Sequence, residues 1–406
     1  MKASPQEAAA ILVDGCDHVV TREELEARLA AGQRLHVKFG IDPTGAELHL
    51  GHAIVLHKMQ QFVELGHRVT LLIGDFTARI GDPSGRNASR PPLTAEQIEA
   101  NMETYREQAG LVLDLERIEV MHNSTWLEPL RLADLIRLFS QITVGQMLVR
   151  EDFKNRYEAG TPISLHEFLY PVAQAFDSIA MRADVELGGN DQLFNLLVAR
   201  DYQVNAGQPP EICMTTPILE GTDGVQRMGK SLGNYISLIE QATDQFGKLM
   251  RIPDTLIARY ARLAAFWSAA EVDALERGLE SARLVAMDEK KRVAEAVVTK
   301  YHGAQAARVA RDYFERTVQR KELPDEMPEL AQGTARRVAD LLVVAGFAES
   351  KRAAERLIAQ GGVRVDGVAL SDPAAGWVWR VPAVLSVGAR RFVRVLPASA
   401  PEPPDR

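Results

Sequence analysis

The amino-acid sequence predicts an α/β protein whose first part is built on a parallel sheet. Between residues 37 and 205, short apolar runs of strand character alternate with longer segments of helical periodicity, and glycine, aspartate and proline separate the two. This alternation is typical of βαβ units, in which a helix connects two parallel strands. Beyond residue 236 the strand pattern nearly disappears, and a small mixed module begins at residue 334.

The composition is that of an ordinary globular protein. Of its 406 residues, 46% are hydrophobic and 25% charged, which suits two or three domains with real cores. No apolar run approaches the roughly 18 residues of a membrane span. The first residues lead into a polar segment instead of an apolar signal region. We therefore expect no membrane association.

The cysteines and the net charge narrow the class further. Cys16 and Cys213 are far apart and have no metal-ligand pattern around them, which favours free thiols in a cytoplasmic protein. The formal net charge of -8 excludes a protein coated with basic residues. It still allows a local basic patch.

The elements of the first part are expected from periodicity and turn residues. The strands expected in the sheet are 37–41, 69–73, 118–121 and 185–187. The helices expected around them are 6–12, 22–31, 48–65, 95–109, 130–139, one beginning near Pro171, and 193–205. The segment 142–160 mixes apolar and charged residues and is interpreted as a mobile insertion.

The turn after the first of these strands is the clearest candidate for an anion site. Residues 42–45 have turn chemistry, and a helix follows, so backbone N–H groups and the positive helix end face the same space. His49 and His52 lie one turn apart there. They could be packing residues, hydrogen-bonding groups or metal ligands, but no further ligand is spaced to complete a metal site.

Polar residues follow two further strands of the predicted sheet. Asp82 lies in the loop after the second strand, and residues 188–192 follow the strand at 185–187. Gln174 and Asp177 share one face of the helix whose start carries Tyr170. Because open α/β sheets bind ligands at the carboxyl ends of their strands, these groups are expected to converge.

One sequence pattern is misleading. Residues 224–231 match the phosphate-loop pattern G-x-x-x-x-G-K-S letter by letter. A phosphate loop needs a strand before it and a helix directly after it, whereas Leu-Gly-Asn follows here and discourages a helix. Arg227 and Lys230 are instead expected on a mobile loop, where two cations could close over a polyphosphate.

The remainder of the chain divides by composition. The expected boundaries are 1–235 with an insertion around 120–190, a helical domain at 236–322, a linker at 323–333, a small module at 334–396 and a disordered tail at 397–406. Between 334 and 396, ten basic residues stand against five acidic ones, which is the charge pattern of a nucleic-acid binder. A solvated charged face is the alternative.

These motifs resemble a known enzyme family. Residues 49–52 resemble the HIGH signature and residues 227–231 the KMSKS signature of class I aminoacyl-tRNA synthetases. Residues 40–44, 80–85 and 189–192, together with Tyr170, Gln174 and Asp177, are similar to the motifs of bacterial tyrosyl-tRNA synthetases. The C-terminal module is similar to the small RNA-binding domain of a ribosomal protein. The resemblance spans nearly the whole chain.

The resemblance implies a fold and an activity. It implies a Rossmann-like catalytic domain, an all-α anticodon-recognition domain and a small α+β RNA-binding module. The reaction would be that of a tyrosine–tRNA ligase: the carboxylate of L-tyrosine attacks the α-phosphorus of ATP, giving tyrosyl-adenylate and pyrophosphate, and tyrosine then passes to the 3′ end of tRNA(Tyr). Mg²⁺ would accompany ATP without a tightly bound cofactor, and the chain would form a homodimer through the region 147–165.

The resemblance also implies three groups of site residues. The catalytic group is Thr44, His49, His52, Arg227 and Lys230. The group that binds ATP and the adenylate is Gly40, Asp42, Gly51, Asp191, Gln192, Met228 and Ser231. The group that binds tyrosine is Asp82, Tyr170, Gln174, Asp177 and Gln192, with Asp177 at the phenol hydroxyl and Asp82, Tyr170 and Gln174 at the ammonium. No metal ligand is implied.

The sequence departs from the family pattern in places. Lys38 stands where many relatives have a tyrosine that shares the phenol hydroxyl, and Phe39 where some have a cysteine near the ribose. Arg227 and Gly229 replace the first lysine and the serine of the second signature. The rival interpretations are a tryptophanyl-tRNA synthetase on the same scaffold and, in another class, a P-loop ATPase or an RNA-binding protein without catalysis.

Overall fold

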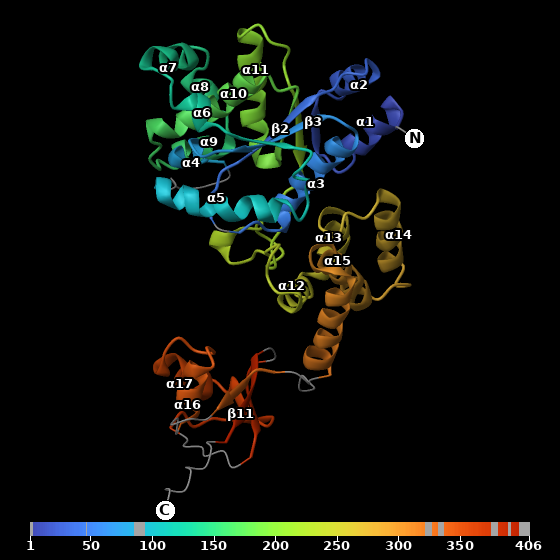
Figure 1. Cartoon of the computed structure of the whole chain (residues 1–406), viewed down its shortest axis with the longest axis vertical. Helices are drawn as coiled ribbons and strands as arrows, with labels where there is room; N and C mark the ends of the chain where they lie inside the picture. Colours follow the sequence, from blue (N-terminus) through green and yellow to red (C-terminus); the bar gives the residue numbers. More distant parts are fainter. Residues whose placement is uncertain are drawn as a thin grey trace, which may run out of the picture. The chain divides into compact units, whose positions relative to one another are not determined.

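The chain forms two compact units, Met1–Ala304 and Gln305–Arg406 (Figure 1). The computed structural model describes residues 3–45, 47–84, 94–320, 327–331, 337–374, 381–388 and 391–397. Two expectations, the loop residues 85–86 and all but the first residue of the tail at 397–406, lie outside these ranges. The domain boundaries expected at 235 and 322 stay predictions.

The first unit contains the predicted parallel sheet, with two more strands than expected. Its strands are β1 (His18–Val20), β2 (His36–Ile41), β3 (Arg68–Ile73), β4 (Glu119–His122), β5 (Val185–Gly189) and β6 (Ile212–Thr216). Their order is β1-β6-β5-β2-β3-β4, and only β1 runs antiparallel to its neighbour. The chain leaves β2 towards β3 and later returns to β5 on its other side. The switch point of the sheet therefore lies between β2 and β5.

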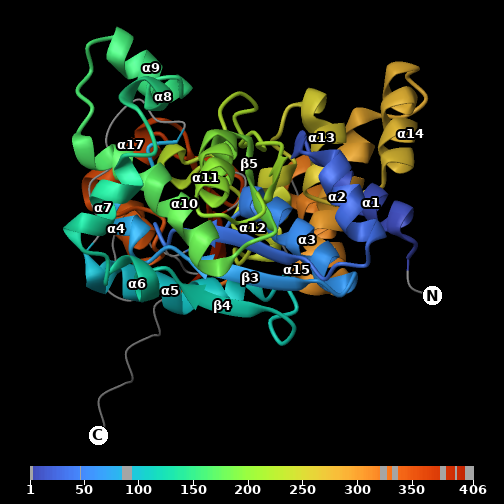
Figure 2. The same cartoon turned by 90° about the horizontal axis from the view of Figure 1, so that it is seen from above.

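Helices cover both faces of this sheet. They are α1 (Pro5–Val13), α2 (Arg22–Ala30), α3 (Leu50–Glu64), α4 (Thr77–Ile80), α5 (Ala95–Ala109), α6 (Ser124–Leu127), α7 (Leu132–Phe139), α8 (Val144–Met147), α9 (Glu151–Glu158), α10 (Leu169–Met181) and α11 (Leu193–Asn205). Figure 1 shows α10 and α11 on one side of the sheet and α3 on the other, and Figure 2 shows α10 and α11 side by side next to β5. The helices expected from periodicity are all present.

The alternation of side chains along β2 decides what each face of the sheet contains. Val37, Phe39 and Ile41 are buried on one face, where apolar contact with the helix layer drives folding. Lys38 points to the other face, because its ammonium reaches a backbone carbonyl of α10. A charged residue therefore lies between the sheet and the helix that carries the predicted tyrosine-binding residues.

Two details differ from the expectations. The segment 142–160, interpreted as a mobile insertion, contains the helices α8 and α9, and it is packed: Phe153 is fully buried, and the buried Arg156 pairs with Glu167. Charges that are buried in pairs look like surface charges in the sequence, which explains the error. α10 begins at Leu169, so Pro171 is its third residue and not its first.

Helices dominate the chain after β6, as expected. They are α12 (Ala242–Leu249), α13 (Ile257–Leu263), α14 (Ala269–Glu280) and α15 (Ala286–Phe314), followed by a π-helical turn at Glu315–Gln319. Short 3-10 turns occur at Leu165–Phe168, Asn190–Gln192, Lys230–Leu232 and Asp254–Leu256. α15 is kinked at Gly303, whose φ of 83° suits glycine, and the border between the two units falls at this kink.

The second unit begins within α15 and includes the predicted small α+β module. It contains β7 (Glu329–Ala331), α16 (Val338–Val344), α17 (Lys351–Ala359), β8 (Val363–Val365), β9 (Val368–Ala369), β10 (Ala383–Val387) and β11 (Arg391–Leu396). The strand order is β7-β11-β10-β8-β9, and apolar residues of both helices and the sheet share one core. β7 lies in the segment expected to be a linker.

Candidate active site

The predicted site residues meet where β2 and β5 end. Asp42 follows β2, and its two carboxylate oxygens accept hydrogen bonds from Tyr170 Oη at 3.0 Å and from Thr77 Oγ1 at 2.7 Å. Tyr170 lies in the first turn of α10, and Thr77 is the first residue of α4, which follows β3. The backbone N–H of Thr44 donates to the carbonyl of Asp42 at 2.8 Å, which tightens the predicted turn. Three segments distant in sequence are thus joined at the switch point.

His49 and His52 form the N-terminal cap of α3. The backbone N–H of Gly51 donates to His49 Nδ1, and that of His49 donates to His52 Nδ1, each at 3.2 Å. Because each Nδ1 accepts, the proton of each neutral ring resides on Nε2. A side chain on Gly51 would lie 3.0 Å from the His49 ring, so it would crowd the imidazole.

Both imidazoles are neutral donors. Burial, with the nearby charge of Lys230, lowers the pKa of His52 to about 3. Burial and the neighbours His52 and Lys230 also hold the pKa of His49 well below its usual value. The arrangement supports the hydrogen-bonding interpretation of the pair. Among the described residues, no group of three or more histidine, cysteine, aspartate or glutamate side chains could hold a metal ion.

The cationic loop reaches both strand ends. Lys230 approaches the turn after β2 so closely that a side chain on Gly45 would lie 2.7 Å from its Nζ. Arg227 Nη1 lies 3.1 Å from Asp191 Oδ2, which follows β5. Met228 is buried and Ser231 exposed. In place of the helix of a phosphate loop, only the 3-10 turn Lys230–Leu232 follows, so rejecting the phosphate-loop pattern is confirmed.

Two of the predicted ammonium-binding residues, Asp82 and Gln174, belong to one hydrogen-bond network, whereas Tyr170 bonds to Asp42. Gln192 Nε2 donates to Asp82 Oδ2 at 2.9 Å. Asn195 Nδ2 donates to Gln174 Oε1 at 3.0 Å and to Gln192 Oε1 at 3.1 Å. The network orients both glutamines. Asn195, on α11, was missed by the sequence analysis.

Arg150 is a second residue that the sequence analysis missed. Its buried guanidinium donates to Asn195 Oδ1 at 3.0 Å and to Ser84 Oγ at 2.9 Å, and it lies 3.8 Å from Asp82 Oδ1. Asp152 pairs with it at 2.7 Å. Arg150 therefore supports Asp82 and Asn195 together. Its only signal in the sequence is a charge beside apolar residues in the segment 142–160.

The predicted phenol-binding end is a buried carboxyl group. Asp177 accepts hydrogen bonds from Trp126 Nε1 at 2.7 Å and from Asn123 Nδ2 at 3.2 Å. Burial raises the pKa of Asp177 to about 7, although Lys38 and the two donors oppose the rise. Trp126 and Asn123 were also missed, because the chain places them near Asp177 only in three dimensions.

Gly40 and Lys38 lie on β2 itself, in opposite environments. Gly40 is exposed, and a side chain built on it would meet no atom within 4 Å, so the sheet edge there is open to a ligand. Lys38 is buried and paired with Glu186 at 3.0 Å. Position 38 of β2 thus belongs to a buried ion pair.

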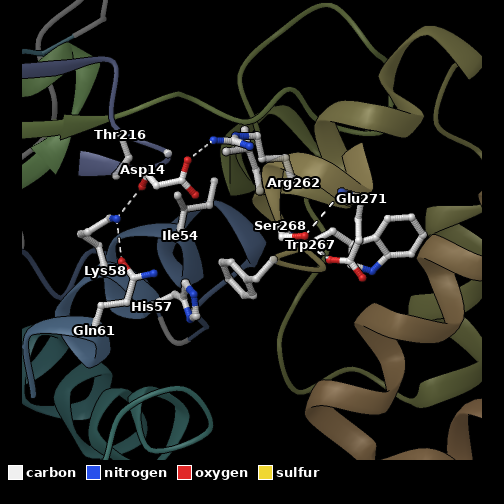
Figure 3. A pocket seen from close by; sticks show the side chains of 13 residues that line it. Asp14, Ile54, His57, Lys58, Gln61, Thr216, Arg262, Trp267, Ser268 and Glu271 are labelled. Atoms are coloured by element: carbon white, nitrogen blue, oxygen red, sulfur yellow. Dashed lines mark hydrogen bonds and ion pairs between the residues drawn. The ribbon is translucent and has the colours of Figure 1, made fainter. Parts of the chain in front are cut away.

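A separate pocket of about 320 Å³ has a lining of its own (Figure 3). Asp14, His57, Lys58, Arg262 and Trp267 line it, and none of the predicted site residues does. Its cations already have partners: Arg262 pairs with the Asp14 carboxylate at 2.5 Å, and Lys58 donates a hydrogen bond to the Asp14 carbonyl at 2.6 Å. In the described part of the chain, no helix is long and apolar enough to cross a membrane.

The chain is similar to curated proteins and to solved structures. A tyrosine–tRNA ligase of Thermotoga maritima is 46% identical over 97% of this chain and 98% of its own, and one of Bordetella pertussis is 46% identical over 95% of both. The fold is that of the tyrosyl-tRNA synthetase from Aeropyrum pernix, with a TM-score of 0.62 at 23% identity over 77% of this chain and 99% of that one.

Family models assign both parts of the chain. Residues 336–375 match the S4 domain. Residues 30–319 match the model described as tRNA synthetases class I (W and Y). The resemblance stated from the motifs is confirmed. The chain belongs to the family of class I tRNA synthetases (W and Y).

Proposed function

We propose that the chain is a tyrosine–tRNA ligase, which activates L-tyrosine with ATP and transfers it to tRNA(Tyr). The observation that carries the proposal is the polar face of α10. Tyr170, Gln174 and Asp177 follow one another along it over roughly 10 Å at 1.5 Å per residue. Groups that can bind an ammonium and a phenol hydroxyl are thus spaced for a tyrosine between them. Curated relatives of this name over nearly the whole chain support the proposal.

The first reaction step needs no general base, because the tyrosine carboxylate is ionised at pH 7. Catalysis then consists of positioning and of stabilising the negative charge on phosphate oxygens. The Nε2–H groups of His49 and His52 and the hydroxyl of Thr44 would donate to ATP. Arg227 and Lys230 would cover the pyrophosphate. Mg²⁺ would enter with ATP as part of the substrate.

A homodimer is part of the proposal. Large apolar side chains are exposed along 136–165: Ile136 on α7, Val144 on α8, Val149 after it, and Leu165, which is 83% exposed. Exposed apolar residues gathered in one region mark interaction surfaces. This region includes the segment expected to form the dimer. Light scattering after size exclusion should give twice the mass of one chain, and a single-chain mass would contradict the dimer.

The remaining parts of the proposal concern tRNA binding and the location of the enzyme in the cell. The helical segment 236–322 would read the anticodon, and the S4 domain would contact tRNA through its basic residues. The enzyme would act in the cytoplasm. Footprinting of tRNA(Tyr) on the full chain and on a chain truncated at residue 331 would test the S4 contact, because protection from that domain should disappear on truncation.

The central test is pyrophosphate exchange into ATP with each of the twenty amino acids. Exchange should require tyrosine. Exchange driven by tryptophan would instead indicate a tryptophanyl-tRNA synthetase, the other specificity of the family. Steady release of phosphate without any amino acid would instead indicate an ATPase.

A further inference from the structure

Lys38 and Glu186 form a buried ion pair in the centre of the first sheet. They are directly opposite each other on the parallel strands β2 and β5. Their side chains are 1% and 2% exposed. Such a pair gives a fold little net stability, because the loss of hydration offsets the attraction between the charges. The reason for its presence should therefore be sought in the groups around it.

A second buried carboxyl group shows how the charges balance. Ser178 Oγ, which has a single proton, lies within hydrogen-bond distance of Glu211 Oε1 at 3.1 Å and of Glu186 Oε2 at 3.4 Å. Burial and the charge of Glu186 raise the pKa of Glu211 well above its usual value, which favours its neutral form. Burial also opposes ionisation of Glu186, but Lys38 and hydrogen bonds from Glu211 and Gln174 lower its pKa. One cation thus faces one anion.

The pair fixes the orientation of Gln174. Gln174 Nε2 donates to Glu186 Oε1 at 3.0 Å, and Lys38 Nζ donates to the backbone carbonyl of Gln174 at 3.3 Å. With its NH₂ group held by Glu186, the amide turns its oxygen to the opposite side, where Asn195 donates to it. An oxygen can accept a hydrogen bond from a substrate ammonium, whereas an NH₂ group cannot.

The same lysine acts on the other end of the proposed tyrosine site. The charges that act on Asp177 are Lys38 of β2, which favours its ionised form, and Glu186 of β5, which opposes it with a smaller effect. Tyr170 is the titratable neighbour on its own helix, and Trp126 and Asn123 are neutral donors. An ionised Asp177 accepts more strongly from a phenol hydroxyl.

We propose that Lys38 is a positioning residue for tyrosine: through Glu186 it presents the oxygen of Gln174 to the ammonium, and through its charge it keeps Asp177 an acceptor for the phenol. The inference rests on the tyrosine site proposed above. It gives Lys38 an indirect role at the position where many relatives have a tyrosine that contacts the phenol directly.

The test compares Lys38→Met with Lys58→Met in tyrosine-dependent pyrophosphate exchange across pH. Lys58 is the matched control, since it is also buried but lies in the separate pocket, bonded to the carbonyls of Ile11 and Asp14 (Figure 3). Lys38→Met should move the acid limb of kcat/KM for tyrosine upward by about one pH unit. Its KM for tyrosine should rise about fivefold near pH 7, and its KM for ATP should stay constant. Lys58→Met should keep the wild-type limb.

A second variant keeps the proposal testable if Lys38→Met unfolds. Lys38→Met combined with Glu186→Gln leaves no unpaired buried charge, and the amide oxygen introduced on β5 can still accept from Gln174. This double variant should fold, keep a nearly normal KM for tyrosine above the limb, and show a smaller upward shift than Lys38→Met. A wild-type limb in either folded Lys38 variant, or an equal rise in KM for tyrosine and ATP, would overturn the inference. Absence of tyrosine-dependent exchange in the wild type would instead overturn the proposed function.

Discussion

At the two ends of the candidate active site, burial has opposite consequences for the protonation state that the proposed function needs. At the proposed ATP end, burial lowers the pKa values of His49 and His52, so the neutral donor is the stable form. At the proposed tyrosine end, burial raises the pKa of Asp177 to about 7, so the charged acceptor is only marginally stable. Burial favours the neutral form in both cases. Only at the tyrosine end does the proposed role need the charged form that burial disfavours. We therefore expect tyrosine binding to depend on pH.

The largest effect is expected from substituting His52, at the proposed ATP end. His52→Ala should lower kcat for pyrophosphate exchange by about 10²–10³-fold, the cost of removing one donor from a developing negative charge. The KM for tyrosine should stay constant. His57→Ala is the control, because His57 lies on the same helix but stacks on Phe266 in the separate pocket. If His52→Ala raised only the KM for tyrosine, the ATP assignment would be wrong.

The next effect concerns the tyrosine end. Asp177→Ala should lower kcat/KM for tyrosine by about a hundredfold, since the phenol hydroxyl would be buried without an acceptor. ATP binding, followed by calorimetry, should persist. Asp201→Ala, an exposed acid on α11, should behave like the wild type. Unchanged tyrosine affinity in Asp177→Ala would remove Asp177 from the phenol site.

The pH dependence of activity should come from Asp177, at the proposed tyrosine end, alone. Below about pH 7, kcat/KM for tyrosine should fall about tenfold per pH unit as Asp177 takes up its proton. The histidines should add no limb near neutrality, because the pKa of His52 is about 3. A second limb that disappears in His52→Ala would contradict this difference between the ends.

Stability should change with pH in the opposite direction to activity. Because the folded-state pKa of Asp177 lies above its unfolded value of 3.8, the folded protein binds the extra proton between these pH values. The contribution of Asp177 to the free energy of unfolding therefore decreases as pH rises from about 4 to 7 and is constant above. Urea midpoints of wild type and Asp177→Ala over this range should diverge accordingly.

The smallest expected effect concerns Arg150. Arg150→Lys should raise the KM for tyrosine by several-fold, because one ammonium cannot reproduce the forked contacts to Asp152, Ser84 and Asn195. The KM for ATP should not change. Arg131→Lys, on the exposed cap of α7, serves as the control. Equal changes in both KM values would reduce Arg150 to a general structural role.

Local sequence patterns predicted most of the sheet and its helices. The strand 37–41 and the helix 193–205 correspond closely to β2 and α11, because turn residues bound them on both sides. β1 and β6 were missed: β1 has three residues, and β6 is buried throughout and so lacks an alternating pattern. Buried charges misled the interpretation of 142–160.

Candidate site residues could be predicted from the sequence where they are part of a motif. Residues that only hold a motif residue in place could not. His49, His52 and Lys230 lie in signatures that can be read from one stretch of chain. Arg150 and Asn195 act through partners from distant segments, and no local pattern announces them. Lys38 is an intermediate case: a lysine inside an apolar strand is a visible anomaly, but its partner is found only when β2 and β5 are paired.

The hydrogen bond from Trp126 to Asp177 gives the protein an intrinsic optical probe. The indole Nε1 lies 2.7 Å from the carboxylate oxygen Oδ1 of Asp177, the group that would accept a hydrogen bond from the phenol hydroxyl. Occupation of the site redistributes charge within contact distance of a fluorescent ring. Emission from Trp126 should therefore report tyrosine binding directly, without ATP, tRNA or an added label, and Trp126→Phe should abolish the signal.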